Sequence, residues 1–430
     1  MRQRDGDLLS LVPRAAYDSP MTPLGYSRRS ILLINDPELV RHVMTDPLEI
    51  FPKNDLMVGA LAPLVGDSIF VSSGERWRRQ REMIDPAFSH MRINTAFAAM
   101  RAAVDDYTHV LRGAADSQNT LSLDFVMSEL TADIICRTIF STPLAGQTAR
   151  DVFDAFGEFE DQVASVNLWQ LIFGKPWADV KQPTAVLDAC ARIRDHIGTL
   201  LDSRLARQDA PDDIVSAIVA ARDQRTGQAF SREELIDQIG VFFLAGHETT
   251  ASVLTWVFFV LSQRPEIAAM VRDEIAEVAG DNPVEFVHVK QLRVIRSVFR
   301  EALRLYPPIT FIPRVAAEET DIGGRHVKRG AMLMLSPWTA HRNALLWRDA
   351  SVFDPLRFLG SNDEDGVLLS FGLGPRVCVG AAFATIESAL IIASLTRDFD
   401  FSILEPEMVR PVARLTTRPA QEIRMQVQRR

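Results

Sequence analysis

Hydrophobic residues recur three or four positions apart along most of the chain, which is the spacing of one face of an amphipathic helix. This pattern predicts helices at residues 36–44, 74–83, 91–114, 123–140, 185–207, 212–223, 294–306 and 381–395. The longest predicted helix spans residues 235–261, and Ser231 and Glu234 before it have the spacing of a capping box. Another helix is expected to start at Pro265, because proline is favoured at the first helical position.

Strand signals are fewer than helix signals. Short apolar runs bounded by turn residues predict strands at residues 31–34, 311–316 and 331–336. Gly323-Gly324 predicts a hairpin turn, and residues 415–427 are expected to form a terminal β-hairpin. The sequence therefore predicts a mainly α fold with a small β-rich part.

The 430 residues contain no linker, repeat or low-complexity stretch, so we expect a single domain over residues 1–430, with residues 1–30 as an N-terminal extension. The first seven residues are mostly charged or polar, and no long apolar run follows them. This argues against a signal peptide or an N-terminal membrane anchor. The most apolar segment, residues 241–261, is interrupted by His247 and Glu248 and is expected to lie in the core.

Charge and cysteine content narrow the function classes. A net charge of −9 argues against a nucleic-acid partner. The three cysteines give no disulfide framework, and no C-x-x-C-H motif offers covalent heme attachment. We therefore expect a cytoplasmic protein in a reducing compartment.

Residues 371–380, Phe-Gly-Leu-Gly-Pro-Arg-Val-Cys-Val-Gly, place Cys378 in a glycine-rich loop directly before a predicted helix. The N-terminus of a helix stabilises an anion, and a thiolate is a strong ligand for iron. Arg376 adds a cation that could meet a carboxylate. A buried structural cysteine is the alternative, and the loop alone does not decide between the two.

Three upstream motifs do decide. Glu301-x-x-Arg304 lies on one face of a predicted helix, where an ordinary surface ion pair is the default interpretation. Ala245-Gly-His-Glu-Thr-Thr250 brings polar residues into the long apolar helix and predicts a bend there. Arg357 follows a proline-containing turn shortly before the Cys378 loop.

These motifs, in this order, resemble the cytochrome P450 superfamily of heme-thiolate proteins, from about Ser30 to the end of the chain. The resemblance implies the cytochrome P450 fold, in which heme b (iron protoporphyrin IX) lies between the long central helix and the helix after the cysteine loop. It further implies that Cys378 is the proximal metal ligand and that Glu248 and Thr249 are the catalytic pair that delivers protons to bound dioxygen.

The resemblance also assigns cofactor-binding and structural positions. Heme contacts are expected from Arg376, Trp77, Arg81, Arg314, Phe371, Gly372, Gly246 and Ala245. Structural roles are expected for Glu301, Arg304 and Arg357, although Ala350 stands where many members carry a proline. Trp77 and Arg81 match the W-x-x-x-R that contacts the heme propionates, whereas Arg78 and Arg79 either face an acidic redox partner or form a solvated helix face.

An intact Glu248-Thr249 pair favours a monooxygenase that inserts one oxygen atom from O2 into a lipophilic small molecule, by hydroxylating a fatty acid, a terpenoid or a polycyclic compound. The expected pocket is apolar and involves residues 56–69, 153–177, 241–245, 309–312 and 415–416. The chain carries no dinucleotide-binding or iron–sulfur motif, so electrons are expected from a separate ferredoxin or flavodoxin-type donor with its reductase. The alternatives are a peroxide-driven peroxygenase and a non-catalytic heme-binding protein.

Overall fold

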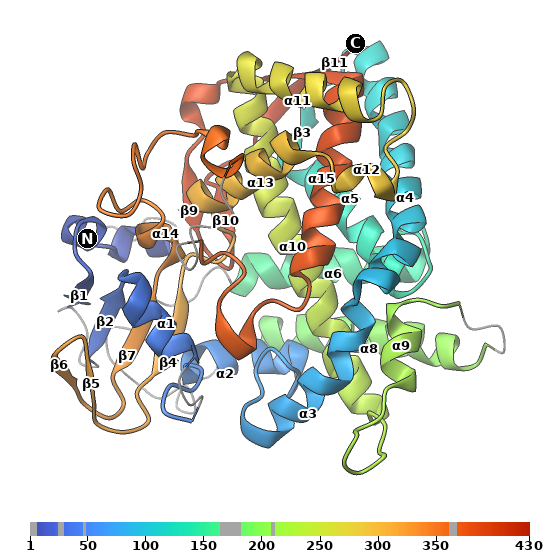
Figure 1. Cartoon of the computed structure of the whole chain (residues 1–430). Coiled ribbons are helices and arrows are strands. Elements are labelled where there is room, and N and C mark those ends of the chain that lie inside the picture. The colour runs from blue at the N-terminus through green and yellow to red at the C-terminus, as the bar shows by residue number, and fades with distance from the viewer. Residues whose placement is uncertain (1–6, 25–29, 46–48, 164–181, 208–210, 361–367) are drawn as a thin grey trace.

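The computed structural model describes residues 7–24, 30–45, 49–163, 182–207, 211–360 and 368–430. Figure 1 shows a helical body beside a smaller β-rich part, with the N-terminus in the β-rich part and the C-terminus at the far end of the body. The fold is mainly α, as the sequence predicts.

The predicted helices are present, with ends that differ by a few residues. They are α1 (Pro37–Thr45), α3 (Gly74–Ile84), α4 (His90–Ser117), α5 (Leu123–Ile139), α8 (Thr184–Leu205), α9 (Ile214–Ala220), α10 (Arg232–Gln263), α11 (Pro265–Val278), α13 (Arg293–Leu305) and α15 (Ala381–Asp398). The hydrophobic pattern did not predict α2 (Asp55–Val65), α6 (Gln147–Val163), α12 (Phe286–Val289) or α14 (Pro337–Ala340). In α2 the reason is visible, because its side chains are apolar nearly all round and Pro63 lies inside it.

Helix α10 runs through the centre of the body and packs against α5, α8, α13 and α15. Its capping box forms: Glu234 N–H donates to the Ser231 hydroxyl, and Ser231 N–H donates to the Glu234 carboxylate at 2.7 Å. By length and composition α10 resembles a membrane span, but most of it is buried inside the body, so it is a core helix. Helix α10 continues without a break through residues 246–250, where the sequence predicts a bend.

The main sheet of the β-rich part has the strand order β1-β2-β7-β4, from Met21–Leu24, Ile31–Ile34, Met332–Leu335 and Ile312–Val315. Strands β2 and β7 are parallel, and the other neighbours are antiparallel. The hairpin predicted at Gly323-Gly324 forms between β5 (Thr320–Ile322) and β6 (Arg325–Val327). Both glycines have positive φ, +57° and +75°, as this tight turn requires.

The predicted terminal hairpin at residues 415–427 is wrong. Strand β10 (Thr417–Pro419) pairs with β9 (Pro411–Ala413), while β11 (Arg424–Arg429) pairs with β8 (Phe399–Ile403) and β3 (Leu121–Ser122). Met425 and Val427 are buried and alternate with exposed neighbours along β11. The pairing of β11 therefore depends on packing against segments that are distant in the chain, which the local sequence does not show.

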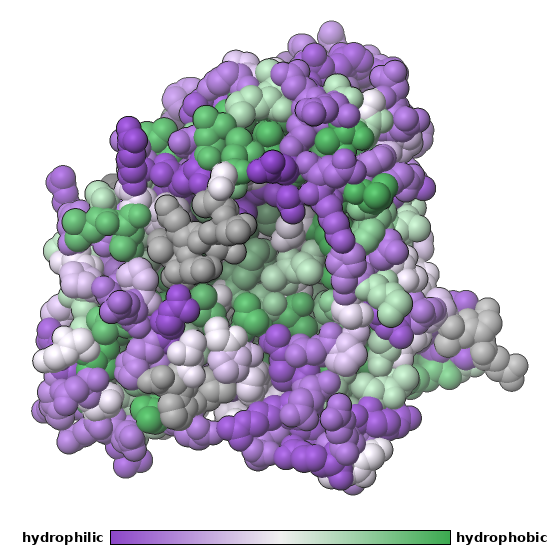
Figure 2. Space-filling model, in the orientation of Figure 1, coloured by the Kyte–Doolittle hydropathy of each residue, from purple (hydrophilic) through white to green (hydrophobic). Residues whose placement is uncertain are grey.

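The helical body and the sheet have separate hydrophobic clusters. The larger cluster joins α4, α5, α10, α13 and α15, and a second one lies between α1 and the main sheet. Figure 2 shows a hollow near the centre of one face of the molecule, with hydrophobic residues inside it and hydrophilic residues around it.

Candidate functional site

The Cys378 loop is held in a defined conformation. Cys378 N–H donates to the Phe371 carbonyl at 2.8 Å, which closes the loop ahead of α15. Gly372 and Gly374 have positive φ, +74° and +66°. A Cβ at Gly374 would lie 2.8 Å from the Met44 carbonyl oxygen, so only glycine fits there without displacing backbone.

Cys378 differs from the other two cysteines in its surroundings. Its side chain is exposed, whereas Cys136 and Cys190 are buried. Desolvation by the surrounding protein raises the pKa of the Cys378 thiol, while the Gly380 N–H and Arg81 oppose that rise. An accessible sulfur that receives a backbone N–H before a helix suits a metal-bound thiolate.

Three cations lie close together beside this loop: Arg314 is buried, and Lys53 and Arg376 are half-buried. Arg376 stacks over the Trp77 ring at 4.3 Å and donates to the Ser72 carbonyl at 3.1 Å. Arg314 on β4 forms an isolated β-bridge with Lys53. Burial lowers the pKa of both arginines to about 10. The pKa of Lys53 lies well below its ordinary value, first because of burial and then because of Arg376 and Arg314.

None of these three cations pairs with a carboxylate in the described part of the chain. Arg314 donates only to the Pro313 carbonyl, and Lys53 lies over the Phe70 ring at 4.9 Å. Like charges crowded in a desolvated place are unfavourable unless an anion joins them. The cation cluster (Lys53, Arg314 and Arg376) therefore fits the two carboxylates of a heme. Lys53 escaped the sequence analysis because an isolated lysine carries no motif.

The arginine cluster on α3 is neutralised rather than free. Arg76 pairs with Asp67, Arg78 with Glu49 and Glu75, and Arg81 with Asp85. The expectation that Arg79 faces a partner is wrong, because its side chain is 17% exposed and pairs with Glu234 and Asp223.

Arg81 also joins α3 to the cysteine loop. Its guanidinium donates to the Val377 carbonyl at 2.6 Å, one residue before Cys378. Its other described partner, Asp85, lies four residues further along the chain at 2.6 Å. Arg81 therefore supports the loop directly, in addition to any contact with a propionate.

On α10, Ala245 and Thr249 form an accessible strip on an otherwise buried stretch of helix. Ala245 is exposed, Gly246 and Thr249 are half-buried, and Val241 to Leu244 are buried. The Thr249 hydroxyl donates a hydrogen bond to the Ala245 carbonyl, one turn earlier in the helix, at 2.5 Å. A Cβ at Gly246 would lie 2.4 Å from Ile135 Cδ1, which shows that glycine is needed here for close packing of α10 on α5.

Glu248 is buried, and its described partners lie on the hairpin formed by β9 and β10, here called the C-terminal hairpin, rather than on Thr249. Thr416 Oγ1 donates to Glu248 Oε1 at 2.5 Å, and Arg418 Nε donates to the same oxygen at 2.8 Å. A second guanidinium nitrogen of Arg418 pairs with Glu248 Oε2. Arg418, which the sequence analysis did not identify, thus neutralises the predicted catalytic acid.

His247 packs within α10 and against α6. Its ring Nδ1 lies 2.8 Å from the Phe243 carbonyl, and its ring packs against Phe153, Phe156 and Phe243. The His247 ring is therefore part of an aromatic cluster in the core.

Glu301 and Arg304 form a fully buried bidentate pair, with both distances 2.7 Å and both side chains 0% exposed. Arg357 Nε lies 3.5 Å from Glu301 Oε1 and completes the predicted trio. Arg304 also donates to the carbonyl of Ala350 at 2.6 Å. The alanine that departs from the family pattern therefore takes part through its backbone.

The expected substrate-pocket residues are only partly within the described chain. Residues 164–177 lie outside it. Of the rest, Thr310 and Thr416 are buried, and Ile309 and Leu415 are half-buried.

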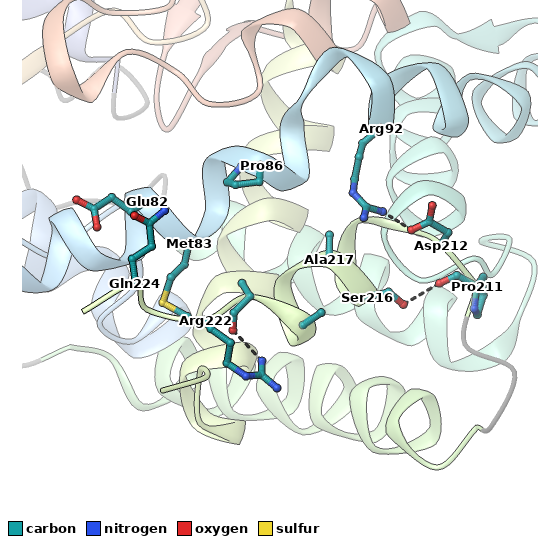
Figure 3. A pocket seen from close by; sticks show the side chains of 12 residues that line it. Glu82, Met83, Pro86, Arg92, Pro211, Asp212, Ser216, Ala217, Arg222 and Gln224 are labelled. Atoms are coloured by element: carbon teal, nitrogen blue, oxygen red, sulfur yellow. Dashed lines mark hydrogen bonds and ion pairs between the residues drawn. The ribbon is translucent and has the colours of Figure 1, made fainter. Parts of the chain in front are cut away.

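A surface pocket of about 450 Å³ lies between the end of α3 and α9 (Figure 3). Arg92 pairs with Asp212 at its rim, and the Ser216 hydroxyl donates to the Pro211 carbonyl at 2.7 Å. None of the predicted site residues is among its described lining residues, so this pocket is separate from the candidate site.

Comparisons with known proteins identify a family for the whole chain. The family model described as cytochrome P450 matches residues 14–427. The chain is 34% identical over 366 residues to the cyclooctat-9-en-7-ol 5-monooxygenase of Streptomyces melanosporofaciens, covering 84% of this chain and 77% of that protein. It is 29% identical over 403 residues to the pentalenene oxygenase of Streptomyces avermitilis, covering 91% and 86%.

Solved structures share the fold. The heme domain of cytochrome P450DA matches with a TM-score of 0.84 at 23% identity, covering 96% of this chain and 90% of that one. A second cytochrome P450 (CYP102L1) matches with a TM-score of 0.81 at 24% identity, covering 93% and 89%.

Proposed function

Because the chain belongs to the cytochrome P450 family of heme-binding monooxygenases, we propose that it hydroxylates a cyclic terpenoid, with Cys378 as the thiolate ligand of the heme iron. When bound, heme b supplies the activation of O2 and the insertion of one oxygen atom into the substrate. The protein's own residues hold this cofactor, shape the pocket and move protons.

The cation cluster holds the cofactor in this proposal. Lys53, Arg314 and Arg376 come from three separate parts of the chain, and each would donate to a propionate oxygen. Charge-assisted bonds of this kind compensate for burying two carboxylates. Trp77 stacks beneath Arg376 and fixes the direction of its guanidinium.

Thr249 is proposed to hold a proton at Oγ1, with Glu248 as the group that resupplies it. The accessible strip of Ala245 and Thr249 on a buried apolar helix is the observation that carries the proposal. A hydroxyl placed among apolar side chains is unfavourable in a core and is useful beside a reacting oxygen.

The terpenoid class is inferred from two facts. The names of the similar proteins above refer to cyclooctat-9-en-7-ol and to pentalenene. The described part of the expected pocket is apolar along residues 241–245, which suits a hydrocarbon skeleton selected by shape. Fatty acids and other polycyclic compounds are the alternatives within the same chemistry.

We further propose that residues 1–430 act as one domain in the cytoplasm and receive electrons from a separate ferredoxin or flavodoxin-type protein. The ion pairs of Arg76, Arg78 and Arg79 argue that the docking of this donor does not depend on free charges on α3.

The experiment is a spectral titration of the purified ferric protein with cyclic terpenoids and, in parallel, with fatty acids of similar size. Displacement of water from the iron by a terpenoid should shift the spectrum from low to high spin at micromolar concentration, and the fatty acids should do so more weakly. Compounds that shift the spectrum are then incubated with O2 and an electron donor. A tighter shift with fatty acids would overturn the substrate class.

A further inference from the structure

The contacts of Glu248 identify a residue that controls it. We propose that Arg418 is a positioning residue, which holds the Glu248 carboxylate on the C-terminal hairpin and so determines how well Glu248 resupplies protons to Thr249. This inference rests on the proposed monooxygenase function and adds to it a residue outside the motifs of the sequence analysis.

The helix geometry separates Glu248 from Thr249. Successive residues of an α-helix point about 100° apart, so the two side chains lie on neighbouring faces of α10. Thr249 shares its face with Ala245, to whose carbonyl it donates. Glu248 shares its face with Ser252 and Trp256, four and eight positions further along.

The Glu248 face of α10 is the docking face for the C-terminal hairpin. Ser252 Oγ and Trp256 Nε1 both donate to the Thr417 carbonyl, at 2.7 and 3.1 Å. Thr417 N–H donates to the Pro308 carbonyl at 2.9 Å, which fixes the strand from its other side. The backbone at Thr417 is therefore tied both to α10 and to the segment after α13.

This anchor aims two side chains at Glu248. Thr416 and Arg418 flank the fixed Thr417, and the side chains of both reach the carboxylate. Arg418 engages both oxygens of Glu248, the geometry that fixes the orientation of a carboxylate best.

Arg418 also connects this buried group to the outside. Its side chain is 20% exposed, against 4% for Glu248. Its guanidinium lies 3.3 Å from the Ser128 hydroxyl on α5. A series of hydrogen bonds thus links the half-buried Ser128 to Arg418 and Arg418 to the buried Glu248. Arg418 both neutralises the Glu248 carboxylate and fixes its orientation.

The test uses the holoenzyme with Arg418→Gln, with Glu248→Gln and with both changes. Arg424→Gln is the matched control, because Arg424 pairs with Glu405 on the surface, where the two side chains are 53% and 62% exposed. The first measurement is product formed per electron pair consumed, with a terpenoid that the wild type hydroxylates, in H2O and in D2O. Arg418→Gln should lower this ratio by about tenfold and change its solvent isotope effect, because small misplacements of a catalytic group are costly.

The double variant decides whether Arg418 acts through Glu248. If it does, adding Arg418→Gln to Glu248→Gln should lower the ratio no further. An equal additional loss in that background would overturn the proposal, and so would an unchanged ratio and isotope effect in Arg418→Gln alone. Arg424→Gln should behave as the wild type.

A second measurement does not depend on turnover. Arg418→Gln leaves a buried carboxylate without its cation, which should lower the thermal unfolding midpoint by roughly 3–5 °C for a chain of this size. Glu248→Gln added to it should restore most of the loss. An unfolding midpoint that is unchanged in Arg418→Gln, or not restored by adding Glu248→Gln, would overturn the proposed role of Arg418. This holds even if the wild type turns over no terpenoid. A lack of terpenoid turnover would count against the proposed function alone.

Discussion

At the scale of single residues, burial decides what a common motif means. A Glu-x-x-Arg pair on a helix is ordinarily a weak surface interaction. Here Glu301 and Arg304 are fully buried, and Asp354 N–H donates to the same carboxylate at 2.9 Å. The pair therefore fastens α13 to the turn that precedes the cysteine loop.

Removing one partner of this pair should be severe. Glu301→Ala leaves the buried Arg304 guanidinium without its carboxylate, and we expect a loss of roughly 3–5 kcal/mol in unfolding free energy together with poor heme retention. Glu266→Ala is the control, because the Arg264–Glu266 pair is mostly exposed. Denaturant unfolding measures the free energy of unfolding, and the heme content of the purified protein measures heme retention. A fully heme-loaded Glu301→Ala protein of normal stability would contradict the structural role.

Lys53 should make heme binding depend on pH. The pKa of Lys53 is lowered in the folded, heme-free protein by burial and then by Arg376 and Arg314. The unfolded chain therefore binds more protons than the folded one, and heme-free stability should rise as pH increases through the folded pKa towards the ordinary value of 10.5. Heme affinity should fall over the same pH range, because Lys53 loses its positive charge as the pH increases.

The variant Lys53→Met removes that charge without removing much bulk. It should stabilise the heme-free protein, lose heme faster to a heme scavenger, and flatten both pH dependences. Lys290→Met, in a turn after α12, is the control for loss of a lysine elsewhere. Identical heme loss rates for wild type and Lys53→Met would exclude Lys53 from the cofactor site.

The three cysteines should report the site by their reactivity. Burial raises the pKa of Cys136 and raises that of Cys190 to about 11, so both stay protonated and inaccessible at pH 8. Cys378 is exposed although its own pKa is raised. Alkylation of the folded, heme-free protein followed by mass spectrometry should modify Cys378 first. The holoenzyme should be protected, and equal labelling of Cys378 with and without heme would contradict its assignment as the ligand.

At the scale of elements, the connection after α2 depends on one glycine. Gly66 has φ +52°, and a Cβ there would lie 2.0 Å from Asp237 Oδ1 on α10. Asp237 accepts from Asp67 N–H at 3.0 Å and from Arg194 of α8 at 2.7 Å. This single carboxylate thus ties together α8, α10 and the segment that leads to α3.

Gly66→Ala should break this connection, whereas Gly74→Ala tests the backbone effect alone. Gly74 has φ +57°, but nothing lies within 4 Å of its added Cβ. We expect Gly74→Ala to cost about 1–2 kcal/mol from the left-handed conformation. Gly66→Ala should cost clearly more, because the carboxylate must move as well. Equal losses in denaturant unfolding would show that the contact with Asp237 is unimportant.

Most helices were predictable from the sequence, whereas the partners of the C-terminal strands were not. The 3.6-residue period and the capping box at Ser231 are local signals, and the structure follows them. Residues 415–427 have strand propensity, but nothing in their local sequence indicates that β11 pairs with β8 and β3. Gly246 is a related case, because its close packing against Ile135 is a contact between segments that are distant in the chain.

At the scale of the whole molecule, the residues of the proposed heme site come from both the β-rich part and the helical body. Lys53 and Arg314 belong to the first, Arg376 to the cysteine loop, and Thr249 to the central helix. The sequence predicted the residues that lie in motifs, such as Cys378. It missed Lys53 and Arg418, because each acts through a contact between segments that are distant in the chain.

The central claim is dioxygen-dependent hydroxylation with Thr249 as the proton-holding residue. The most direct measurement is turnover of a bound terpenoid under ¹⁸O2 with an electron donor, recording ¹⁸O in the product and product formed per electron pair. The wild type should place one ¹⁸O in each product molecule. Thr249→Ala should keep heme and substrate binding but release peroxide or superoxide, with the ratio reduced within the range of about 10²–10⁴-fold that general acid–base groups supply. Equal ratios in the two proteins, or product formed only from added peroxide, would contradict the account.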